Sequence, residues 1–393
     1  MKKLFTTLSN IWKIEDLRVR IINTLLFLLI YRVGSFVVLP GVNYASLANA
    51  QSGKGGLVGL LDMFAGGSFS RASIFALGVM PYISASIVMQ LLGIAVPYFA
   101  KLQKEGESGR NKINQWTRYM TIGITALQAV GYVQSQIQTD QISPMMGPAT
   151  FKILSIFILT AGTLFVMWLG EKITDKGIGN GISLIIMVGI IAQLPGAFLA
   201  ELGVRNGGKG GLITFIVEIL ALIGVVMLTI LIVQGTRKVA VQYAKRIVGN
   251  KQYGGVRQYI PLKVNAANVM PIIFAQALMF IPATIPQFMP SAATNSVVMA
   301  LSNINSWEHN LLFAILIIVF TYFYTAIIVN PNQMADDMKK NGGFVPGIKP
   351  GKPTADFIDG VISKITLPGS IFLAIIAIIP AFVSILGVNN LFA

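Results

Sequence analysis

Residues 53–96 read GKGGLVGLLDMFAGGSFSRASIFALGVMPYISASIVMQLLGIAV, and the interpretation of the whole chain starts from this stretch. It holds two apolar runs with Gly66-Gly67 near the break between them. Leu57–Phe69 is about 13 residues long, short of the roughly 20 that a helix needs to cross a bilayer, whereas Ala72–Val96 is long enough. Backbone that does not span is tolerated at membrane depth only inside protein or against a water-filled cavity. We therefore expect a membrane protein with a cavity that holds a short re-entrant segment.

The composition is that of a polytopic membrane protein, because 54% of the 393 residues are hydrophobic and only 11% are charged. The chain has no cysteine and a single histidine, His309, so thiol chemistry, histidine-rich metal sites and serine–histidine hydrolysis are hard to build. The glycines of GIGNGIS at 177–183 lack the lysine-serine ending of a phosphate-binding loop. We expect no enzyme and no catalytic, metal or cofactor site.

Nine apolar segments have spanning length, which predicts an all-α polytopic membrane fold. They are residues 21–39, 72–96, 116–134, 151–170, 180–198, 211–234, 266–287, 311–330 and 366–387. Residues 1–20 are basic and weakly amphipathic, as expected of a helix that lies on the membrane surface. Glu15 and Asp16 interrupt the approach to the first apolar run, so we expect no cleaved signal peptide.

The basic residues predict the orientation. If the N-terminus is cytoplasmic and 57–69 does not cross, the cytoplasmic segments hold 24 of the 30 lysines and arginines. These segments are 1–20, 97–118, 171–179, 235–265 and 331–365. If 57–69 crossed, every later basic loop would move outside, against the positive-inside rule. The short run is therefore expected to be re-entrant.

Many transport proteins consist of two inverted halves, and an odd number of spans is unusual for such a fold. Residues 21–198 would form an N-terminal half with spans one to five. Residues 199–393 would form a C-terminal half with only spans six to nine. We expect a tenth helix that is absent from this chain.

Two predicted cytoplasmic loops, 235–265 and 331–365, are long and basic. In the second, prolines stiffen FVPGIKPGKP, because each fixes its own φ. A rigid cationic projection suits docking on an anionic partner. The alternative is that the basic residues only enforce the topology, although the loops are longer than that requires.

Five stretches, in order, resemble the SecY family, the channel subunits of bacterial protein-translocation complexes. They are SRASIFALGVMPYISASIVMQLL at 70–92, KEGESGRNKINQWTRY at 104–119, MWLGEKITDKGIGNGISLII at 167–186, PLKVNAANVMP at 261–271 and NGGFVPGIKPGKPTADFID at 341–359. The similarity extends from about Asp16 to Leu386. Several long motifs in the right order are far more specific than a lone glycine pattern.

The resemblance implies a SecY-type bundle of two inverted-repeat halves around a pore, with a plug at about 57–67. The implied plug residues are Leu57, Leu60, Leu61, Met63, Phe64, Gly66 and Gly67. It also implies an apolar pore ring at Val79, Ile83, Ile186 and Ile273. Such a ring would gate by dewetting. Aliphatic pairs at this spacing occur on any spanning helix, so the ring follows from the resemblance alone.

The resemblance further implies a lateral gate, through which hydrophobic segments leave the channel for the lipid. Its candidate polar residues are Gln90, Thr121, Asn268 and Gln276. Buried amides that exchange partners could set how readily this seam opens. Ordinary interhelical hydrogen bonding, worth about 1 kcal/mol, is the alternative. Pro271, Pro282 and Pro286 would let span seven bend.

By the same resemblance, the partners are SecA, the ribosome with its RNA phosphates, SecE, SecG, signal peptides, nascent chains and membrane lipid. The implied docking residues for the ribosome or SecA are Arg246, Lys251, Lys349 and Lys352. The location would be the bacterial cytoplasmic membrane. The family often has arginine where this chain has Lys349 and Asn332, and lysine lacks the bidentate fork of arginine. We therefore expect a docking surface that is weakened or redistributed.

Two other classes of function are possible from the residues alone. A secondary transporter should place ionisable residues near the middle of the membrane, but Arg32 and Glu218 lie nearer the outer ends of their spans. An intramembrane enzyme would need an apparatus that one histidine, His309, on the external side does not supply. A passive protein-conducting channel, driven by its partners, is the function that the sequence favours.

Overall fold

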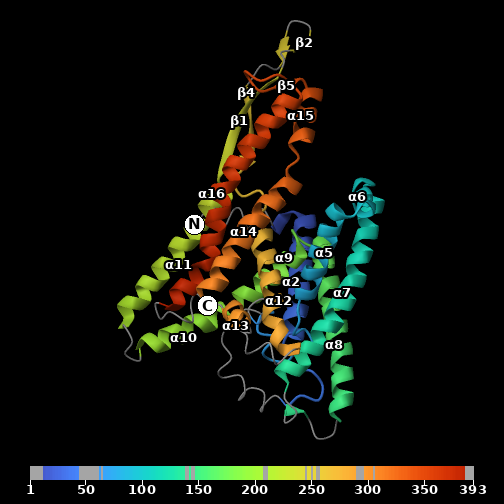
Figure 1. Ribbon diagram of the computed structural model, residues 1–393, viewed down its shortest axis with the longest axis vertical. Helices are drawn as coiled ribbons and strands as arrows, with labels where there is room; N and C mark the ends of the chain where they lie inside the picture. The colour runs from blue at the N-terminus through green and yellow to red at the C-terminus, as the bar shows by residue number, and fades with distance from the viewer. Residues whose placement is uncertain are drawn as a thin grey trace. The chain divides into compact units, whose positions relative to one another are not determined.

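The computed structural model describes residues 12–43, 62, 65–137, 141–142, 147–206, 211–243, 246–248, 251–253, 257–288, 296–303 and 306–385. The chain divides into two compact units. The N-terminal unit is Met1–Leu199 with Phe280–Ser302, and the C-terminal unit is Ala200–Met279 with Asn303–Ala393. Both are mainly helical, in agreement with the expected fold class (Figure 1).

The N-terminal unit is a bundle of helices that pack around α8. Its helices are α2 (Glu15–Gly34), α5 (Met80–Ala95), α6 (Pro97–Lys104), α7 (Glu107–Gln136), α8 (Pro148–Lys176), α9 (Gly181–Ile191), the start of α10 (Leu194–Asn206) and α13 (Ser296–Ser302). α8 packs against α7, α9 and α2, and α5 packs against α7. Figure 1 shows α7 and α8 side by side along most of their lengths.

Local sequence explains where these helices begin. Proline occupies the first turn of α5, α6 and α8, where its missing N–H is not needed and its φ already suits a helix. Asn180 caps α9, and its side-chain oxygen accepts a hydrogen bond from the backbone N–H of Ser183 at 3.1 Å. The chain thus leaves the α8–α9 turn in a fixed direction.

The second predicted span, 72–96, is wrong at its start. Residues 65–79 form a series of turns, and the helix begins only at Met80. α5 and α6 are then bent by 101° at the break before Pro97. Glycines interrupt the turn region, and three of them, Gly66, Gly67 and Gly78, have positive φ, which a right-handed helix cannot accommodate.

Close backbone packing holds the turn region against α8. A Cβ atom on Gly162 of α8 would collide with the carbonyl oxygen of Ile74, so this helix face approaches the turns as only glycine allows. Short pairings tie the region to the end of α2, where Leu39 N–H donates to Ala72 O at 2.8 Å and Ile74 N–H to Val37 O at 2.9 Å. The re-entrant region is therefore packed inside the N-terminal unit.

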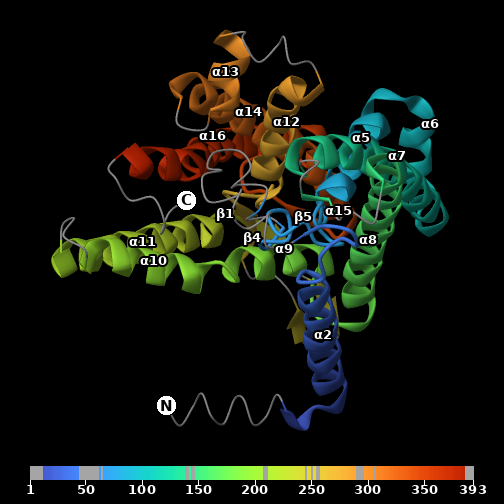
Figure 2. The ribbon, with the colours of Figure 1, turned by 90° about the horizontal axis from the view of Figure 1, so that it is seen from below.

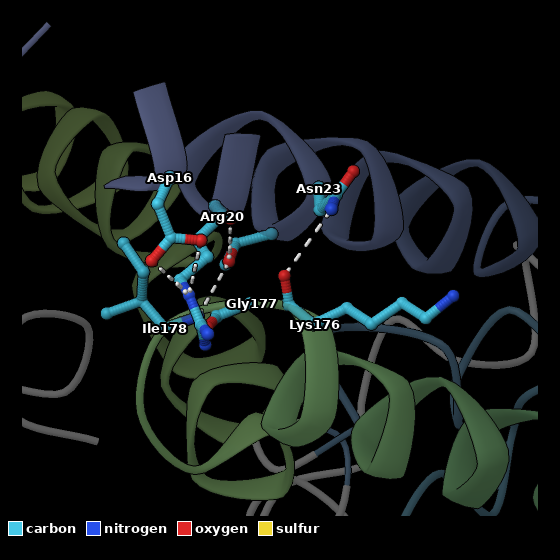
Figure 3. A network of polar contacts seen from close by, with 7 residues as sticks. Asp16, Arg20, Asn23, Lys176, Gly177 and Ile178 are labelled. Atoms are coloured by element: carbon cyan, nitrogen blue, oxygen red, sulfur yellow. Dashed lines mark hydrogen bonds and ion pairs between the residues drawn. The ribbon is translucent and has the colours of Figure 1, made fainter. Parts of the chain in front are cut away.

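Polar contacts fix α2 on the α8–α9 turn (Figure 3). Asn23 Nδ2 donates to Lys176 O at 3.4 Å, and Arg20 Nη1 to Gly177 O at 3.5 Å. The Thr24 hydroxyl donates to Arg20 O at 2.8 Å and accepts from Ile178 N–H at 3.1 Å. These bonds satisfy the open backbone of the glycine turn that leads into α9.

The C-terminal unit combines helices with a small sheet. It contains α11 (Gly211–Gln234), β1 (Thr236–Tyr243), β2 (Arg246–Val248), β3 (Lys251–Tyr253), β4 (Arg257–Lys263), most of α12 (Met270–Phe288), α14 (Trp307–Ile328), α15 (Pro331–Lys340), β5 (Gly343–Phe344) and α16 (Lys352–Ile385). α16 packs along α14 and α15, and α12 shares an apolar cluster with α14 and α16. Figure 2 shows α11 beside the end of α10.

The two segments predicted as basic loops fold into one body. β1 pairs antiparallel with β4, from Thr236↔Lys263 to Gln242↔Arg257, and β5 joins the other edge of β1 at Gln242↔Phe344. Figure 1 shows β1 and β4 as a long hairpin with β2 towards its tip, and β2 pairs antiparallel with β3. A shared apolar core lies under the sheet, made of Val239, Val241, Leu262, Met338, Val345, Ile358 and Ile362.

Among the described residues, five helices are individually long and apolar enough to cross a membrane, and the bent α5–α6 pair makes a sixth. The five are Pro148–Lys176, Gly181–Asn206, Gly211–Gln234, Trp307–Lys340 and Lys352–Val383. Each overlaps one of the nine predicted spans. The full number of nine stays a prediction.

Candidate functional site

Three of the four residues assigned to the pore ring line one small pocket of the N-terminal unit. Val79 caps the start of α5, Ile83 lies one turn later, and Ile186 projects from α9. The other lining residues are Ala65, Leu77, Gly78 and Met80. The side chains of this lining are all apolar, so water there finds few hydrogen-bond partners. Ile273 lies half-buried on α12 of the C-terminal unit, which is described separately.

The described end of the predicted plug lies against this pocket. Ala65 is a lining residue with 3% of its surface exposed, and Gly66 follows with a φ of 64°. Gly67 has a φ of 82°. Leu57, Leu60, Leu61, Met63 and Phe64 lie outside the described residues. The structure thus brings the C-terminal end of the plug segment and three ring candidates together.

Side chains of several elements donate hydrogen bonds to the backbone at the end of the predicted plug and just after it. Tyr132 of α7 donates to Phe69 O at 2.7 Å, and Gln193, after α9, donates to Asp62 O at 3.0 Å. Tyr31 of α2 reaches Ala65 O at 3.5 Å. An unpaired carbonyl in a membrane interior costs several kcal/mol, so these donors are what allow a non-helical segment there.

Two arginines act on the same segment. Arg32 Nη1 and Arg71 Nη2 both donate to the carbonyl oxygen of Gly66, at 2.8 and 2.9 Å. Arg32 is an ionisable residue within a predicted span, and such a position is itself an indicator of function. Nothing in the spacing of Tyr31, Tyr132 or Gln193 distinguishes them from ordinary residues of a spanning helix, so their roles were not predicted.

The lateral-gate candidates of the N-terminal unit lie on two packed helices. Gln90 of α5 donates to Ser86 Oγ at 3.2 Å. Thr121 of α7 is fully buried, and its hydroxyl donates to Thr117 O within its own helix at 2.8 Å. Thr125 repeats this pattern one turn later, at 2.6 Å. In this conformation Thr121 therefore directs its proton to its own helix rather than across a seam.

The other two gate candidates belong to the C-terminal unit. Asn268 is exposed, has a φ of 54° and donates from Nδ2 to Ala266 O at 3.5 Å. This left-handed conformation turns the chain just before α12 begins. Gln276 is half-buried on α12. Both residues thus mark the start of a single helix.

The docking candidates lie on the sheet body of the C-terminal unit. Arg246 and Lys251 belong to the short β2–β3 pair, and their side chains are not among the described atoms. Lys349 is exposed in the turn before α16, and Lys352 is exposed as the first residue of that helix. The buried hydroxyl of Thr354 donates to Lys349 O at 2.9 Å and stiffens that turn. Two cationic candidates therefore lie at an ordered helix start.

A buried ionic cluster that the sequence did not predict lies in the N-terminal half of α11. Arg205 Nε lies 3.0 Å from Glu201 Oε1, and Arg205 Nη2 lies 2.5 Å from Glu218 Oε1. At least nine-tenths of each side chain is buried. Glu218 is thus an ion-pair partner that links α10 to α11, which agrees with a structural role better than with ion coupling. Among the described residues, no cluster of acidic, histidine or cysteine side chains could hold a metal ion.

Comparison with known proteins gives consistent results. The family model described as SecY matches residues 73–392. The protein translocase subunit SecY of Streptomyces coelicolor is 41% identical over 393 residues, which cover 96% of this chain and 89% of that protein.

Solved channel structures share the fold. A structure described as that of a protein conducting channel has a TM-score of 0.68 at 18% identity and covers 96% of this chain and 87% of that one. A structure on the plug domain of the SecY protein, described as stabilising the closed state, has a TM-score of 0.63 at 16% identity, with 96% and 87% covered. Sec61 in a canine ribosome-channel complex has a TM-score of 0.59 at 16% identity, with 96% and 86% covered. At these identities the likeness concerns the fold.

Proposed function

Because this chain belongs to the SecY family, we propose that it is the protein-conducting channel subunit of a bacterial Sec translocase. It passes unfolded secretory proteins across the membrane and releases hydrophobic segments sideways into the lipid. It is a passive channel and not an enzyme, so the driving energy comes from its partners. The observation that carries this proposal is the pocket in which Val79, Ile83 and Ile186 meet the end of the re-entrant segment.

Closure of the pore follows from the chemistry of that pocket. Branched aliphatic side chains hold water poorly, so a narrow ring of them drains and blocks ions. The same side chains can move apart without breaking hydrogen bonds when a polypeptide arrives. Ile273 completes the ring in this proposal, and the plug residues Leu57–Gly67 cover it from the outer side.

Lateral release requires the two halves of the channel to separate along one seam. We place Gln90 and Thr121 on one side of it and Asn268 and Gln276 on the other. The buried hydroxyl of Thr121 is satisfied within α7, so opening the seam would leave it with its partner. The amide side chains are then the groups whose partners change, and they tune how readily the seam opens.

The sheet body of the C-terminal unit is the proposed cytoplasmic docking surface. Lys349 and Lys352 are exposed, and Arg246 and Lys251 lie on the same β-rich body. They would meet RNA phosphates of the ribosome or acidic surfaces of SecA, and the binding should weaken as salt rises. SecE and SecG are the expected membrane partners. This arrangement requires a multi-pass protein of the bacterial cytoplasmic membrane with its N-terminus in the cytoplasm.

Reconstitution tests the proposal. The full chain, placed in liposomes with SecE, SecG and SecA, should move a precursor protein to a protease-protected site in the presence of ATP. A precursor with a disrupted signal sequence is the matched control and should stay outside. Coupled uptake of a small solute without polypeptide passage would instead identify a transporter and refute the proposal.

A further inference from the structure

Two like-charged side chains converge on one backbone atom beside the proposed pore. Arg32 comes from the last turn of α2, and Arg71 comes from the turn region that follows the plug. Both donate to Gly66 O, at 2.8 and 2.9 Å. Both guanidinium groups also lie over the ring of Phe36, with centroid distances of 4.9 and 4.3 Å.

The surroundings offset the repulsion between the two cations. The carbonyl oxygen of Gly66 carries a partial negative charge, and the face of the Phe36 ring is also negative. Hydrogen bonds from charged donors are stronger than neutral ones, and a low local dielectric strengthens them further. Two arginines that share an acceptor and an aromatic face therefore hold the chain at Gly66 more firmly than ordinary turn contacts would.

Gly66 also packs closely against α9. A Cβ atom at position 66 would lie 3.0 Å from Gly189 Cα and 3.3 Å from Arg32 Nη1. Glycine is therefore required both for this space and for the positive φ. Gly189 is three residues after Ile186 on the same helix. The chain at Gly66 therefore contacts both the two arginines and the helix that carries a ring residue.

We propose that Arg32, Phe36 and Arg71 form a clamp that keeps the end of the re-entrant segment seated against the pore ring. Ala65, the residue before the clamped carbonyl, lines the ring pocket. Loosening the clamp should therefore let the segment leave the pocket more often and destabilise the closed channel. The three residues position the segment and do not touch the passing polypeptide. The proposal rests on the proposed function only in taking this pocket as the closed pore.

The absence of native cysteine provides a direct measurement. Ser68 is fully buried two residues after Gly66, and its hydroxyl has no hydrogen-bond partner among the described residues. Ser68→Cys is nearly isosteric and introduces the only thiol. The experiment uses membranes that contain the full chain with SecE and SecG. A membrane-impermeant thiol reagent is added on the outer side, and its rate of reaction with this cysteine reports how often the segment opens.

The variants should rank by how much of the clamp they retain. Arg71→Leu should label on the order of tenfold faster than the parent, as expected for loss of one hydrogen bond from a charged donor. Arg71→Lys keeps the charge and can keep the hydrogen bond to Gly66 O, but it loses the planar guanidinium group, so its labelling rate should fall between those of Arg71→Leu and the parent. Arg32→Gln and Phe36→Leu should each accelerate labelling by a smaller factor. Arg110→Gln, a substitution of an exposed arginine on α7, is the control and should leave the rate unchanged.

Two outcomes would overturn the clamp. One is an unchanged labelling rate in both Arg32→Gln and Phe36→Leu, which are mild enough to fold if Arg71→Leu does not. The other is a labelling rate in a folded Arg71→Leu protein that is no faster than that of Arg110→Gln, which would mean that the contacts of Arg71 do not hold the segment. Polypeptide passage through the parent channel is measured separately, so its failure would refute the proposed function while the labelling rates still judge the clamp.

Discussion

Two apolar segments of this protein differ sharply in how they are accommodated: residues 65–79 and α11. α11 is a regular helix of 24 residues in which only Phe215 and Glu218 are buried. Residues 65–79 are mostly buried but form turns, with glycines at positive φ. Both segments are too apolar for water, yet one faces outwards and the other lies inside the N-terminal unit.

The difference shows that backbone hydrogen bonding, rather than hydrophobicity, decides between the two. A helix satisfies its own carbonyls, so α11 can expose apolar side chains to lipid at little cost. The turns at 65–79 leave carbonyls open, and these are met by Tyr132, by Arg32 and by other side chains. The re-entrant segment is therefore stable only where such donors surround it.

The largest expected effect comes from adding one methyl group on α8, where it faces the turns, and one on α11. Gly162→Ala should collide with the Ile74 carbonyl and destabilise the protein by about 3 kcal/mol. Gly224→Ala on α11 meets nothing within 4 Å and should be neutral or stabilise the helix by up to about 1 kcal/mol. Thermal unfolding of the purified proteins measures both. Equal changes in melting temperature for Gly162→Ala and Gly224→Ala would show that the turns are not packed closely on α8.

A second test exchanges apolar for polar side chains in the two environments. Ile83→Ser combined with Ile186→Ser should wet the proposed ring and raise the resting ion conductance several-fold. Ile223→Ser, at a half-exposed position of α11, is the control and should leave conductance unchanged. Single-channel recording in planar bilayers makes the comparison. If the double variant conducts no more than the parent, the ring assignment is wrong.

A third test removes one donor from the turn region. Tyr132→Phe deletes the 2.7 Å hydrogen bond to Phe69 O and should cost about 1–3 kcal/mol, because it leaves a buried carbonyl unpaired. Tyr119→Phe removes a hydroxyl from the exposed side of the same helix, α7, and should change the melting temperature little. If Tyr132→Phe lowers the melting temperature no more than Tyr119→Phe does, the carbonyl of Phe69 has found another partner.

The smallest effect is expected at the turn that leads into α9. Thr24→Val keeps the shape of the side chain but leaves the N–H of Ile178 unpaired, and should cost about 1 kcal/mol. Thr24→Ser retains the hydroxyl and should restore most of the stability. Melting temperatures of the two variants distinguish the loss of this hydrogen bond from a loss of packing. If packing were the cause, Thr24→Ser would be less stable than Thr24→Val.

Sequence reasoning predicted the membrane class, the re-entrant segment and the ring residues by different means. Length and charge placement predicted the first two, because a run of about 13 apolar residues cannot span a bilayer. Motif resemblance supplied Val79, Ile83 and Ile186, which a periodic pattern does not distinguish from other aliphatic positions. The strands β1 and β4 were missed because their basic residues suggested a loop, although TRKVAVQY contains the alternation of a strand.

The sequence by itself determined which segments are apolar enough to enter a membrane and which loops carry the positive charge, because both depend on composition and order along the chain. Only the tertiary structure decided which side chains satisfy the open backbone at 65–79. Arg32 and Gly66, or Tyr132 and Phe69, are far apart in sequence, and no local rule pairs them. A hydrogen bond depends on distances of a few tenths of an ångström, which only the folded packing of α2, α7 and α8 establishes.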